Sequence, residues 1–373
     1  MQPRIPIPDD RPWRVLGLMS GTSADGVDAV AIEVDPHGFQ DGRPFHGFLG
    51  HHSAPYPAQV REQVLAAASN RLDPAGLCVL QRRLGNHHAR AARDLCAALG
   101  IRPDLASLHG QTVQHHPHQG ASLQLADPYV LAETLACPVI WDLRRRDLAL
   151  GGQGAPLVPL PERWLHGVGP WLALNLGGLA NITIWDGQTT RAWDTGPGMS
   201  LLDLAAQRWL GLPFDPEGAA ATGLVNESLL TAWLRHPYFA ADPPKSTGRE
   251  VFGQAWIEVE SGALEALPLQ DRLSTLAAFT AETVAREAAR AAPWPMGLKG
   301  LVSGGGARHR RLRAELAARL PLKMEDDATF PSGAREAVSW ALLGAASALG
   351  IPGNLPAVTG ASRAAVLGSW VWP

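Results

Sequence analysis

Three glycine-rich segments of this chain are candidates for binding phosphate groups. They are Ser20-Gly21-Thr22-Ser23, the pair Gly177-Gly178 between Asn175 and Asn181, and Gly304-Gly305-Gly306. Glycine permits positive φ angles and a close backbone approach, which let N–H groups converge on phosphate oxygens. Each segment alone indicates only a turn, but three of them together predict a nucleotide site.

The first segment differs from a Walker P-loop. An apolar run, 13–18, enters it and a β-branched run, 27–34, leaves it, so the pattern predicts strand, turn and strand. A P-loop opens a helix and supplies a lysine, whereas the first lysine of this chain is Lys245. The third segment precedes a helical stretch, 307–320, whose N-terminus suits an anionic or polar ligand.

Two carboxylates flank the first segment, Asp25 and Asp28. Either could simply cap the bend or support the strand that follows. A nucleotide site also needs an oxygen-rich environment for Mg²⁺, commonly one or two carboxylates with waters and phosphates. Asp25 is the carboxylate that we predict to bind the Mg²⁺ ion, through a water molecule.

These segments resemble the phosphate-1, phosphate-2 and adenosine segments of the actin-like ATPase, sugar kinase and Hsp70 superfamily. Within it, the stretch 19–28 looks like the signature of the 1,6-anhydro-N-acetylmuramic acid kinase family, whose members are bacterial enzymes of cell-wall (murein) recycling. Further segments resemble that family in the same order along nearly the whole chain: 109–112, 142–147, 151–159, 194–198, 244–250 and 355–362.

The resemblance implies an enzyme that uses ATP and Mg²⁺. Such a kinase opens the anhydro ring with water and phosphorylates O6, giving N-acetylmuramic acid 6-phosphate and ADP. The resemblance also implies a homodimer. The residues it assigns to the nucleotide are Ser20, Gly21, Thr22, Ser23, Asn175, Gly177, Gly178, Asn181, Gly304, Gly305 and Gly306.

Asp194 stands before the turn 195–198. A loop aspartate is most often a turn former or a helix cap. The resemblance implies instead that Asp194 is the general base. This role suits the chemistry, because water that attacks an anomeric carbon must lose a proton.

The resemblance also assigns residues to the sugar. Thr112 is implied in the sugar site, although a polar residue at a strand end could equally be structural. A guanidinium suits the lactyl carboxylate of a muramic acid, and the prediction is Arg145 or Arg146 from a run that could also be solvated. Glu336 opens a helical stretch, which favours acidic residues, and its family counterpart faces the sugar.

Bulk properties exclude several classes of protein. The chain has 373 residues, 46% of them hydrophobic, and a net charge of −3. A charge this small gives no basic field for nucleic acid or an anionic membrane, so the expected partners are ATP and a small sugar. No apolar run is long enough for a membrane helix. Cys78, Cys96 and Cys137 lack metal-binding spacing and are predicted to be buried free thiols of a cytoplasmic protein.

The helices and strands expected around the candidate site residues indicate an α/β fold. Apolar periodicity favours helices over 58–69, 73–99, 199–210, 269–291, 307–320 and 335–349, and short strands over 105–108, 139–141, 171–176 and 364–371. A strand-turn-strand unit recurs once in each half. The expected architecture is two actin-like (ribonuclease H-like) lobes around a central nucleotide and sugar cleft, the first formed by 1–165 with 350–373 and the second by 166–349.

Two other functions use the same features. One is a different sugar or small-acid kinase with an ordinary hydroxyl nucleophile, and the other is a non-catalytic, nucleotide-gated binding or filament protein. The sequence also departs from the family pattern at two positions. His309 stands where an asparagine is expected, which puts its contact with adenosine in doubt, and Gly253 stands in place of another asparagine.

Overall fold

The computed structural model describes residues 8, 10–21, 24–167, 169–243, 245–327 and 330–373. The chain forms two compact units, Met1–Val168 with Gly333–Pro373, and Gly169–Ser332. The expected division assigned 333–349 to the second lobe, and this part of it is wrong. These residues belong to the first unit, because two glycines allow the helix that contains them to pack closely on its sheet.

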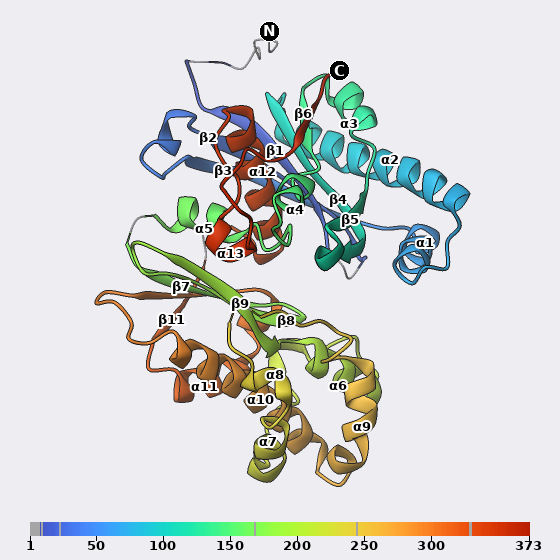
Figure 1. Cartoon of the computed structure of the whole chain (residues 1–373). Helices are drawn as coiled ribbons and strands as arrows, with labels where there is room; N and C mark the ends of the chain where they lie inside the picture. The colour runs from blue at the N-terminus through green and yellow to red at the C-terminus, as the bar shows by residue number, and fades with distance from the viewer. Residues whose placement is uncertain (1–7, 9, 22–23, 168, 244, 328–329) are drawn as a thin grey trace. The chain divides into compact units, whose positions relative to one another are not determined.

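The first unit is built on a seven-stranded sheet with the path β12-β6-β4-β1-β2-β3, and β5 pairs with β4 (Figure 1). The antiparallel strands β1, β2 and β3 form one half, and β4 and β6 add in parallel on the other side of β1. The strands are β1 (Trp13–Ser20), β2 (Gly26–Val34), β3 (Phe45–Pro55), β4 (Leu105–His116), β5 (Ala121–Leu125), β6 (Val139–Trp141) and β12 (Ser369–Val371).

Helices cover both faces of this sheet because alternate residues of β1 point to opposite sides. Leu16 and Leu18 belong to the core that includes residues of α2 (Pro74–Leu99). On the other face, a Cβ at Gly17 would lie 2.0 Å from the carbonyl oxygen of Ala337 in α12 (Arg335–Ala348), and a Cβ at Gly344 of α12 would lie 2.4 Å from Ser107 in β4. The glycines therefore allow α12 to contact β1 and β4 directly, which is why this helix belongs to the first unit.

The C-terminal segment is fixed to the first unit by Asp147, whose side chain is buried. Its Oδ2 accepts a hydrogen bond from Gly154 N, and its Oδ1 accepts from Asn354 Nδ2 and Thr359 Oγ1, both at 2.7 Å. The segments 151–159 and 355–362 thus meet at one carboxylate. The remaining helices of this unit are α1 (Ala58–Ala68), α3 (Pro128–Leu135), α4 (Arg145–Ala149), α5 (Pro159–His166) and α13 (Pro356–Thr359).

The second unit repeats the same strand order in a five-stranded sheet, β11-β10-β7-β8-β9. Here β7, β8 and β9 are antiparallel, and β10 and β11 add in parallel beyond β7. The strands are β7 (Trp171–Leu176), β8 (Leu179–Trp185), β9 (Thr190–Pro197), β10 (Lys299–Ser303) and β11 (Met324–Asp326). Apart from β5, which lies off the path of the first sheet, both sheets have the order third-second-first-fourth followed by a further parallel strand, which confirms two related actin-like (ribonuclease H-like) α/β units.

The core of the second unit lies on one face of its sheet. Leu172, Leu174 and Ile182 pack there with Phe279 of α10, the helix Leu269–Arg290. On the opposite face Trp171, Ala173 and Trp185 form a small separate cluster. The other helices are α6 (Ser200–Leu210), α7 (Glu227–Trp233), α8 (Pro237–Ala240), α9 (Gln254–Glu265) and α11 (Arg310–Arg319).

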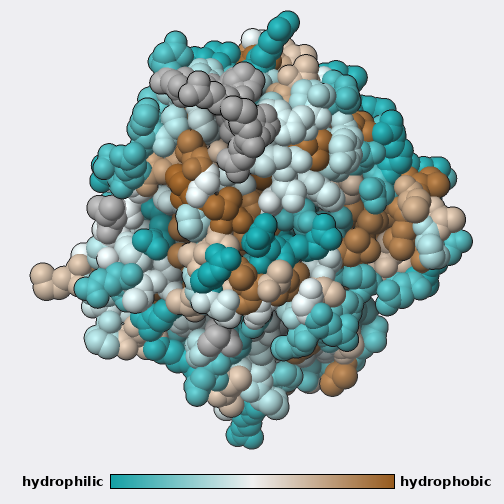
Figure 2. All heavy atoms as spheres, turned by 45° about the horizontal axis from the view of Figure 1, so that its top comes forward, coloured by the Kyte–Doolittle hydropathy of each residue, from teal (hydrophilic) through white to brown (hydrophobic). Residues whose placement is uncertain are grey.

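Within the described part of the chain, no helix combines the length and the apolar character that a membrane span requires. Hydrophilic and hydrophobic side chains are interspersed on the face that Figure 2 presents. Cys96 and Cys137 are buried free thiols as predicted, whereas Cys78 is exposed on α2, so its predicted burial is wrong. Residue 78 lies on the outward side of a long amphipathic helix, and an apolar run alone did not distinguish its sides.

Candidate functional site

A row of polar residues crosses the sheet of the second unit. Ser303 of β10 pairs with Asn175 of β7, Asn175 pairs with Asn181 of β8, and Asn181 pairs with Asp194 of β9. Directly paired residues point to the same face of a sheet. Their neighbours Leu174, Ile182 and Trp193 belong to the core, so this row faces away from it. Asn175 and Ser303 lie at the carboxyl ends of parallel strands, where open α/β sheets bind ligands.

Asp194 is held by the loop that follows α8. Its backbone N–H donates to Lys245 O at 3.2 Å, and its Oδ2 accepts a hydrogen bond from Thr247 N at 3.0 Å. The hydroxyl of Tyr238 donates to Asp194 O at 2.6 Å. Burial raises the pKa of the Asp194 carboxyl to about 6, the Thr247 N–H opposes this shift, and Glu250 adds to it. The carboxyl is thus poised to exchange a proton near neutral pH.

The loop beside Asp194 carries further polar groups. Among the residues that the structure describes, the buried hydroxyl of Thr247 has no hydrogen-bond partner, which leaves it free for a ligand. A Cβ at Gly178 would lie 3.2 Å from a guanidinium nitrogen of Arg249, so this cation lies against the glycine turn. Burial raises the pKa of Asp203 in α6 to about 6, while Arg249 opposes the shift.

The turn Gly177-Gly178 is stacked on the start of α6. Gly198 N and Ser200 N donate to Gly178 O at 3.0 and 2.9 Å, and Met199 N donates to Gly177 O at 2.8 Å. A Cβ at Gly198 would lie 2.3 Å from Gly177 O, so only glycine allows this approach. The predicted phosphate-2 turn is therefore a fixed structure joined to a helix N-terminus.

The segment 304–306 meets the same turn. A Cβ at Gly304, which has a φ of +87°, would lie 2.6 Å from the carbonyl of Leu176 and 2.7 Å from Asn175 Oδ1. A Cβ at Gly306 would lie 2.8 Å from the Leu176 side chain. A Cβ at Gly305 would meet no atom of the other described residues within 4 Å, its chain neighbours aside. The outer glycines are thus packed against β7, and Gly305 faces open space. The structure brings the predicted phosphate-2 and adenosine segments together.

The two departures from the family pattern have structural explanations. His309 is the N-cap of α11, where its Nδ1 accepts a hydrogen bond from Leu312 N at 3.2 Å, a capping role that asparagine also performs. Its ring is buried against the turn that contains Gly218. At Gly253 a Cβ would lie 2.1 Å from Arg249 O, so glycine permits the start of α9 there.

In the first unit, Ser20 ends β1 with its hydroxyl buried. The Ser20 Oγ lies 2.7 Å from Tyr56 Oη and 3.2 Å from His88 Nε2, and His88 Nδ1 lies 2.7 Å from Leu84 O. Burial lowers the pKa of His88 to about 4, so the ring is neutral and donates from Nδ1 to the carbonyl. These contacts of Ser20 therefore support the turn. Thr22 and Ser23 lie outside the described residues.

Gly21 and the two aspartates surround this turn. Gly21 O accepts hydrogen bonds from Ala24 N at 3.2 Å and from Gln111 Nε2 at 3.0 Å. The side chain of Asp25 is 74% exposed, with Arg61 Nε at 3.8 Å, so its oxygens are open to a cation. Asp28 pairs with His51, whose Nε2 is 2.9 Å away. Asp25 is thus the more available of the two carboxylates.

Thr112 lies on β4 beside Gln111. Its Oγ1 accepts a hydrogen bond from Gln124 Nε2 at 3.2 Å across the pairing with β5. The Oε1 atom of Gln111 is buried and has no hydrogen-bond partner among the described residues. A ligand or water that donates to this oxygen would remove the cost of leaving a buried acceptor unpaired.

Arg144 is the arginine of the run that the fold holds in place. Its Nε donates to His109 Nε2 at 3.0 Å, its Nη1 donates to Gly154 O at 2.8 Å, and its guanidinium lies 5.1 Å from the Trp340 ring centre. Burial lowers the pKa of Arg144 to about 10, and Glu336 opposes this shift. Sequence reasoning did not select Arg144. Its position three residues after the end of strand β6 is the sequence feature that could have identified it.

Arg145 and Arg146 have exposed side chains at the start of α4, and Arg145 is paired with Asp142. Glu336 lies in the first turn of α12, as predicted, and the residue is exposed. Desolvation raises the pKa of Glu336, Arg144 opposes the shift and Asp28 adds to it. Glu336, Arg144 and Asp28 are therefore electrostatic neighbours.

The sequence was compared with those of known proteins. A family model described as "Anhydro-N-acetylmuramic acid kinase" matches residues 13–373. The chain is 43% identical to the anhydro-N-acetylmuramic acid kinase of Parasynechococcus marenigrum (strain WH8102), over 96% of this chain and 99% of that protein. It is also 43% identical to the protein of that name from Bordetella pertussis, over 95% of this chain and 94% of its relative. The Synechococcus sp. (strain CC9311) protein of that name is 41% identical over 96% of this chain and all of its own length, 100%.

Proposed function

Because this chain belongs to the anhydro-N-acetylmuramic acid kinase family, we propose that it phosphorylates 1,6-anhydro-N-acetylmuramic acid with ATP. The products are N-acetylmuramic acid 6-phosphate and ADP, and the reaction serves cell-wall (murein) recycling. The observation that carries the chemistry is the Asp194 carboxyl, which is held by Thr247 N at 3.0 Å in a polar row beside two glycine turns.

The anhydro bridge dictates the order of bond changes. O6 links C6 to C1, so it has no free hydroxyl until the C1–O6 bond breaks. Water attacks C1, and Asp194 accepts the proton that the water loses. The electron pair of the broken C1–O6 bond stays on O6, which takes the γ-phosphoryl group of ATP. Positioning and charge stabilisation supply most of the acceleration in phosphoryl transfer.

The proposed nucleotide contacts are the glycine-rich segments. In the second unit they are Asn175, Gly177, Gly178, Asn181 and the segment 304–306. In the first unit they are Ser20, Gly21, Thr22 and Ser23. The open space beside Gly305 supports a close backbone approach by the ligand there. The buried hydroxyl of Ser20 supports a role in holding the turn, with the phosphate contacts made by the backbone.

Mg²⁺ suits the proposed phosphate site of the first unit. The Asp25 carboxylate is a hard oxygen ligand, and its exposure leaves room for the waters that Mg²⁺ keeps. When bound, the ion neutralises charge on the phosphate oxygens. Asp25 would hold it directly or through water, and Arg61 would release the carboxylate at the same time.

The proposed sugar contacts are Thr112, Glu336 and one exposed arginine, Arg145 or Arg146. The exposure of these two guanidinium groups supports binding of the lactyl carboxylate. The half-buried Arg144 is held by His109 and Gly154. The accessible Glu336 carboxyl would accept a hydrogen bond from a sugar hydroxyl. We further propose a homodimer in the cytoplasm, as the family resemblance implies.

The test combines a coupled ADP assay with isotope labelling. The enzyme is given the anhydro sugar and ATP in ¹⁸O-labelled water, and the product is analysed before its anomeric oxygen exchanges. Label on the C1 oxygen and sugar-dependent ADP release are expected. ADP release with no label at C1 would identify a kinase that phosphorylates an existing hydroxyl. Nucleotide binding with no sugar-dependent ADP release would identify a non-catalytic protein.

A further inference from the structure

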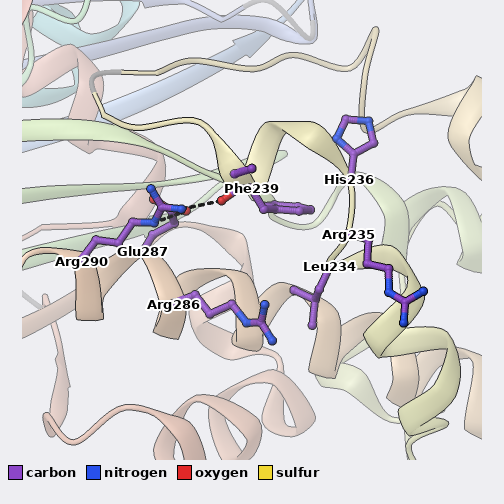
Figure 3. A pocket seen from close by; sticks show the side chains of 8 residues that line it. Leu234, Arg235, His236, Phe239, Arg286, Glu287 and Arg290 are labelled. Carbon is purple, nitrogen blue, oxygen red and sulfur yellow. Dashed lines mark hydrogen bonds and ion pairs between the residues drawn. The ribbon is translucent and has the colours of Figure 1, made fainter.

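Glu287 of α10 is a buried carboxylate that accepts hydrogen bonds from two side chains and forms an ion pair with a third. Its side chain is 1% exposed, and its Oε1 lies 2.8 Å from Lys245 Nζ. Its Oε2 accepts a hydrogen bond from Trp193 Nε1 at 3.0 Å, and Arg290 Nε lies 3.6 Å from Oε1. Figure 3 shows Glu287 beside Arg290, whose Nη2 donates to Phe239 O at 2.6 Å.

Two of these donors lead directly to Asp194. Trp193 precedes it in β9, and Lys245 O accepts the N–H of Asp194. Two residues beyond Lys245, Thr247 N donates to the Asp194 carboxylate. Glu287 thus fixes both the strand and the loop that hold this carboxylate.

Tyr238 connects the same groups by a second route. Lys245 Nζ donates to Tyr238 O at 3.1 Å and lies 4.7 Å from the centre of its ring. The Tyr238 hydroxyl in turn donates to Asp194 O. Movement of Lys245 would therefore be transmitted to Asp194 through Tyr238 as well as through the loop.

Glu287 acts from the opposite side of the sheet. Successive residues of a strand point to opposite faces, and Trp193, which contacts Glu287, belongs to the core while Asp194 belongs to the polar row. Glu287 is therefore separated from the reacting atoms by the sheet, and it reaches Asp194 through its contacts with Trp193 and Lys245.

The hollow next to Glu287 offers a competing interpretation as an anion site. It has a volume of about 630 Å³, and Arg235, Arg286 and Arg290 are among the residues that line it. Arg286 Nε is paired with Glu282, however, and Arg290 also binds Asp242 and backbone carbonyls. Arg286 and Arg290 thus serve the protein's own acceptors, and Arg290 is also a partner of Glu287, so the contacts favour a role for Arg290 in holding Glu287.

We propose that Glu287 is a positioning residue for the reaction: its carboxylate, bonded to Trp193 and Lys245, holds Asp194 where it can accept the proton of the attacking water. This inference rests on the proposed role of Asp194. Displacement of a reacting group by about 1 Å costs about 100-fold in rate. Loss of the Glu287 contacts should therefore lower kcat far more than it weakens ATP binding.

The first variant is Glu287→Gln, which keeps an acceptor for Trp193 and leaves the buried Lys245 without its counterion. We expect kcat to fall by about 10–100-fold, with the KM for ATP within about twofold of the parent. The acid limb of the kcat profile should move to higher pH, because the Thr247 N–H that lowers the pKa of Asp194 becomes misplaced. Glu250 raises the pKa of Asp194, and Asp194 raises the pKa of Tyr238; both Glu250 and Tyr238 are unchanged in this variant.

A double variant, Glu287→Gln with Lys245→Met, separates positioning from stability. Removing both charges of a buried pair is often neutral or stabilising, whereas removing one is costly. The double variant should therefore regain thermal stability while kcat stays low, because the anchor of the loop is lost. If kcat returned to the parent value together with stability, Glu287 would be merely structural. If Glu287→Gln does not fold, the double variant alone decides between these outcomes.

Glu282→Gln is the matched control. Glu282 is on the same helix, and its partners are Arg286 and Arg319. Its kcat and pH profile should match those of the parent. Asp194→Asn distinguishes the two hypotheses: an active Asp194→Asn enzyme would overturn the proposed role of Asp194. An inactive one, combined with a folded Glu287→Gln enzyme of unchanged kcat and pH profile, would overturn only the positioning role.

Discussion

The backbone N–H of Thr247 donates a hydrogen bond of 3.0 Å to one carboxylate oxygen of Asp194. Among the described residues no hydrogen bond is made to the other oxygen, Oδ1, so it can interact with a substrate or a water molecule. Burial favours the neutral acid and the N–H favours the carboxylate, and the balance places the pKa of Asp194 at about 6. One hydrogen bond thus orients the group while leaving it basic enough to accept a proton.

Replacement of Asp194 by asparagine removes the proposed base and preserves the size of the side chain. We expect kcat to fall by about 10²–10⁴-fold, because that is the usual contribution of a general base. Binding of ATP, measured by calorimetry, should be unchanged. Asp41→Asn, at an exposed position of the first unit, is the control and should have parental turnover. An Asp194→Asn enzyme within a few-fold of the parent would contradict the assignment.

Activity should depend on pH through Asp194. The base must be ionised, so kcat should fall about tenfold per pH unit below about pH 6. The pKa is raised above its ordinary value of 3.8, so ionisation of this group opposes folding, and protonation at lower pH relieves that cost. Loss of activity through Asp194 is therefore distinct from acid unfolding. The measurement is kcat from about pH 5 to 8, with thermal unfolding followed at each pH.

Asp203 provides the control for that profile, because burial raises its pKa to about 6 as well. Asp203→Asn should keep the acid limb if Asp194 causes it. Disappearance of the limb in Asp203→Asn would assign the titration to Asp203 instead. A flat profile down to pH 5 in the parent enzyme would show that neither carboxyl limits turnover.

Adjacent glycines should respond differently to alanine. Gly304→Ala places a Cβ about 2.6 Å from the carbonyl of Leu176 at a positive φ, which should cost about 2 kcal/mol or more of folding free energy. In the described part of the chain, the Cβ of Gly305→Ala would meet no atom within 4 Å beyond its chain neighbours, so the unfolding temperature of this variant should be parental. If ATP approaches Gly305, that variant should instead raise the KM for ATP. Unchanged KM and stability in Gly305→Ala would place the nucleotide elsewhere.

Much of the fold could be predicted from local sequence. Strands β1 and β2 and helices α2 and α10 have strong apolar periodicity, and their expected and observed bounds differ by at most two residues. Strand β3 was missed, because its side chains do not alternate cleanly between buried and exposed and it contains two glycines. The position of α12 was also missed, since its packing depends on Gly17, which is more than 300 residues away in sequence.

The candidate site, like the fold, could be predicted from the sequence only in part. Glycine turns and a motif aspartate are visible in sequence because one residue type at one position carries the signal. The contacts that hold Asp194 are not visible in the sequence. Tyr238, which binds Asp194, is 44 residues away from it, and Glu287, which binds the neighbouring Trp193, is 94 residues away from that tryptophan. A buried glutamate within an alanine-rich helix has no local signature that separates it from a solvated one. Contacts of this kind require the tertiary structure.

Single lysine replacements can show which arginine of the run 144–146 contacts the sugar carboxylate. Arg144→Lys should lower the unfolding temperature, because lysine cannot maintain the paired bonds to His109 and Gly154. Arg145→Lys or Arg146→Lys should raise the KM for the anhydro muramic sugar without loss of stability. The matched substrate is the same anhydro sugar without its lactyl group, and its KM should not change in any exposed-arginine variant. Equal effects on both sugars would exclude recognition of the carboxylate.

Asp147→Asn tests whether the C-terminal segment depends on a single carboxylate. Both oxygens of Asp147 accept hydrogen bonds, from Gly154, Asn354 and Thr359, so an asparagine would direct its NH₂ group at a donor. We expect a loss of about 2–4 kcal/mol in the free energy of unfolding, measured with urea. Asp94→Asn, on the exposed side of α2, is the control and should change stability by less than about 0.5 kcal/mol. An Asp147→Asn protein as stable as this control would show that packing alone holds residues 354–359 to the first unit.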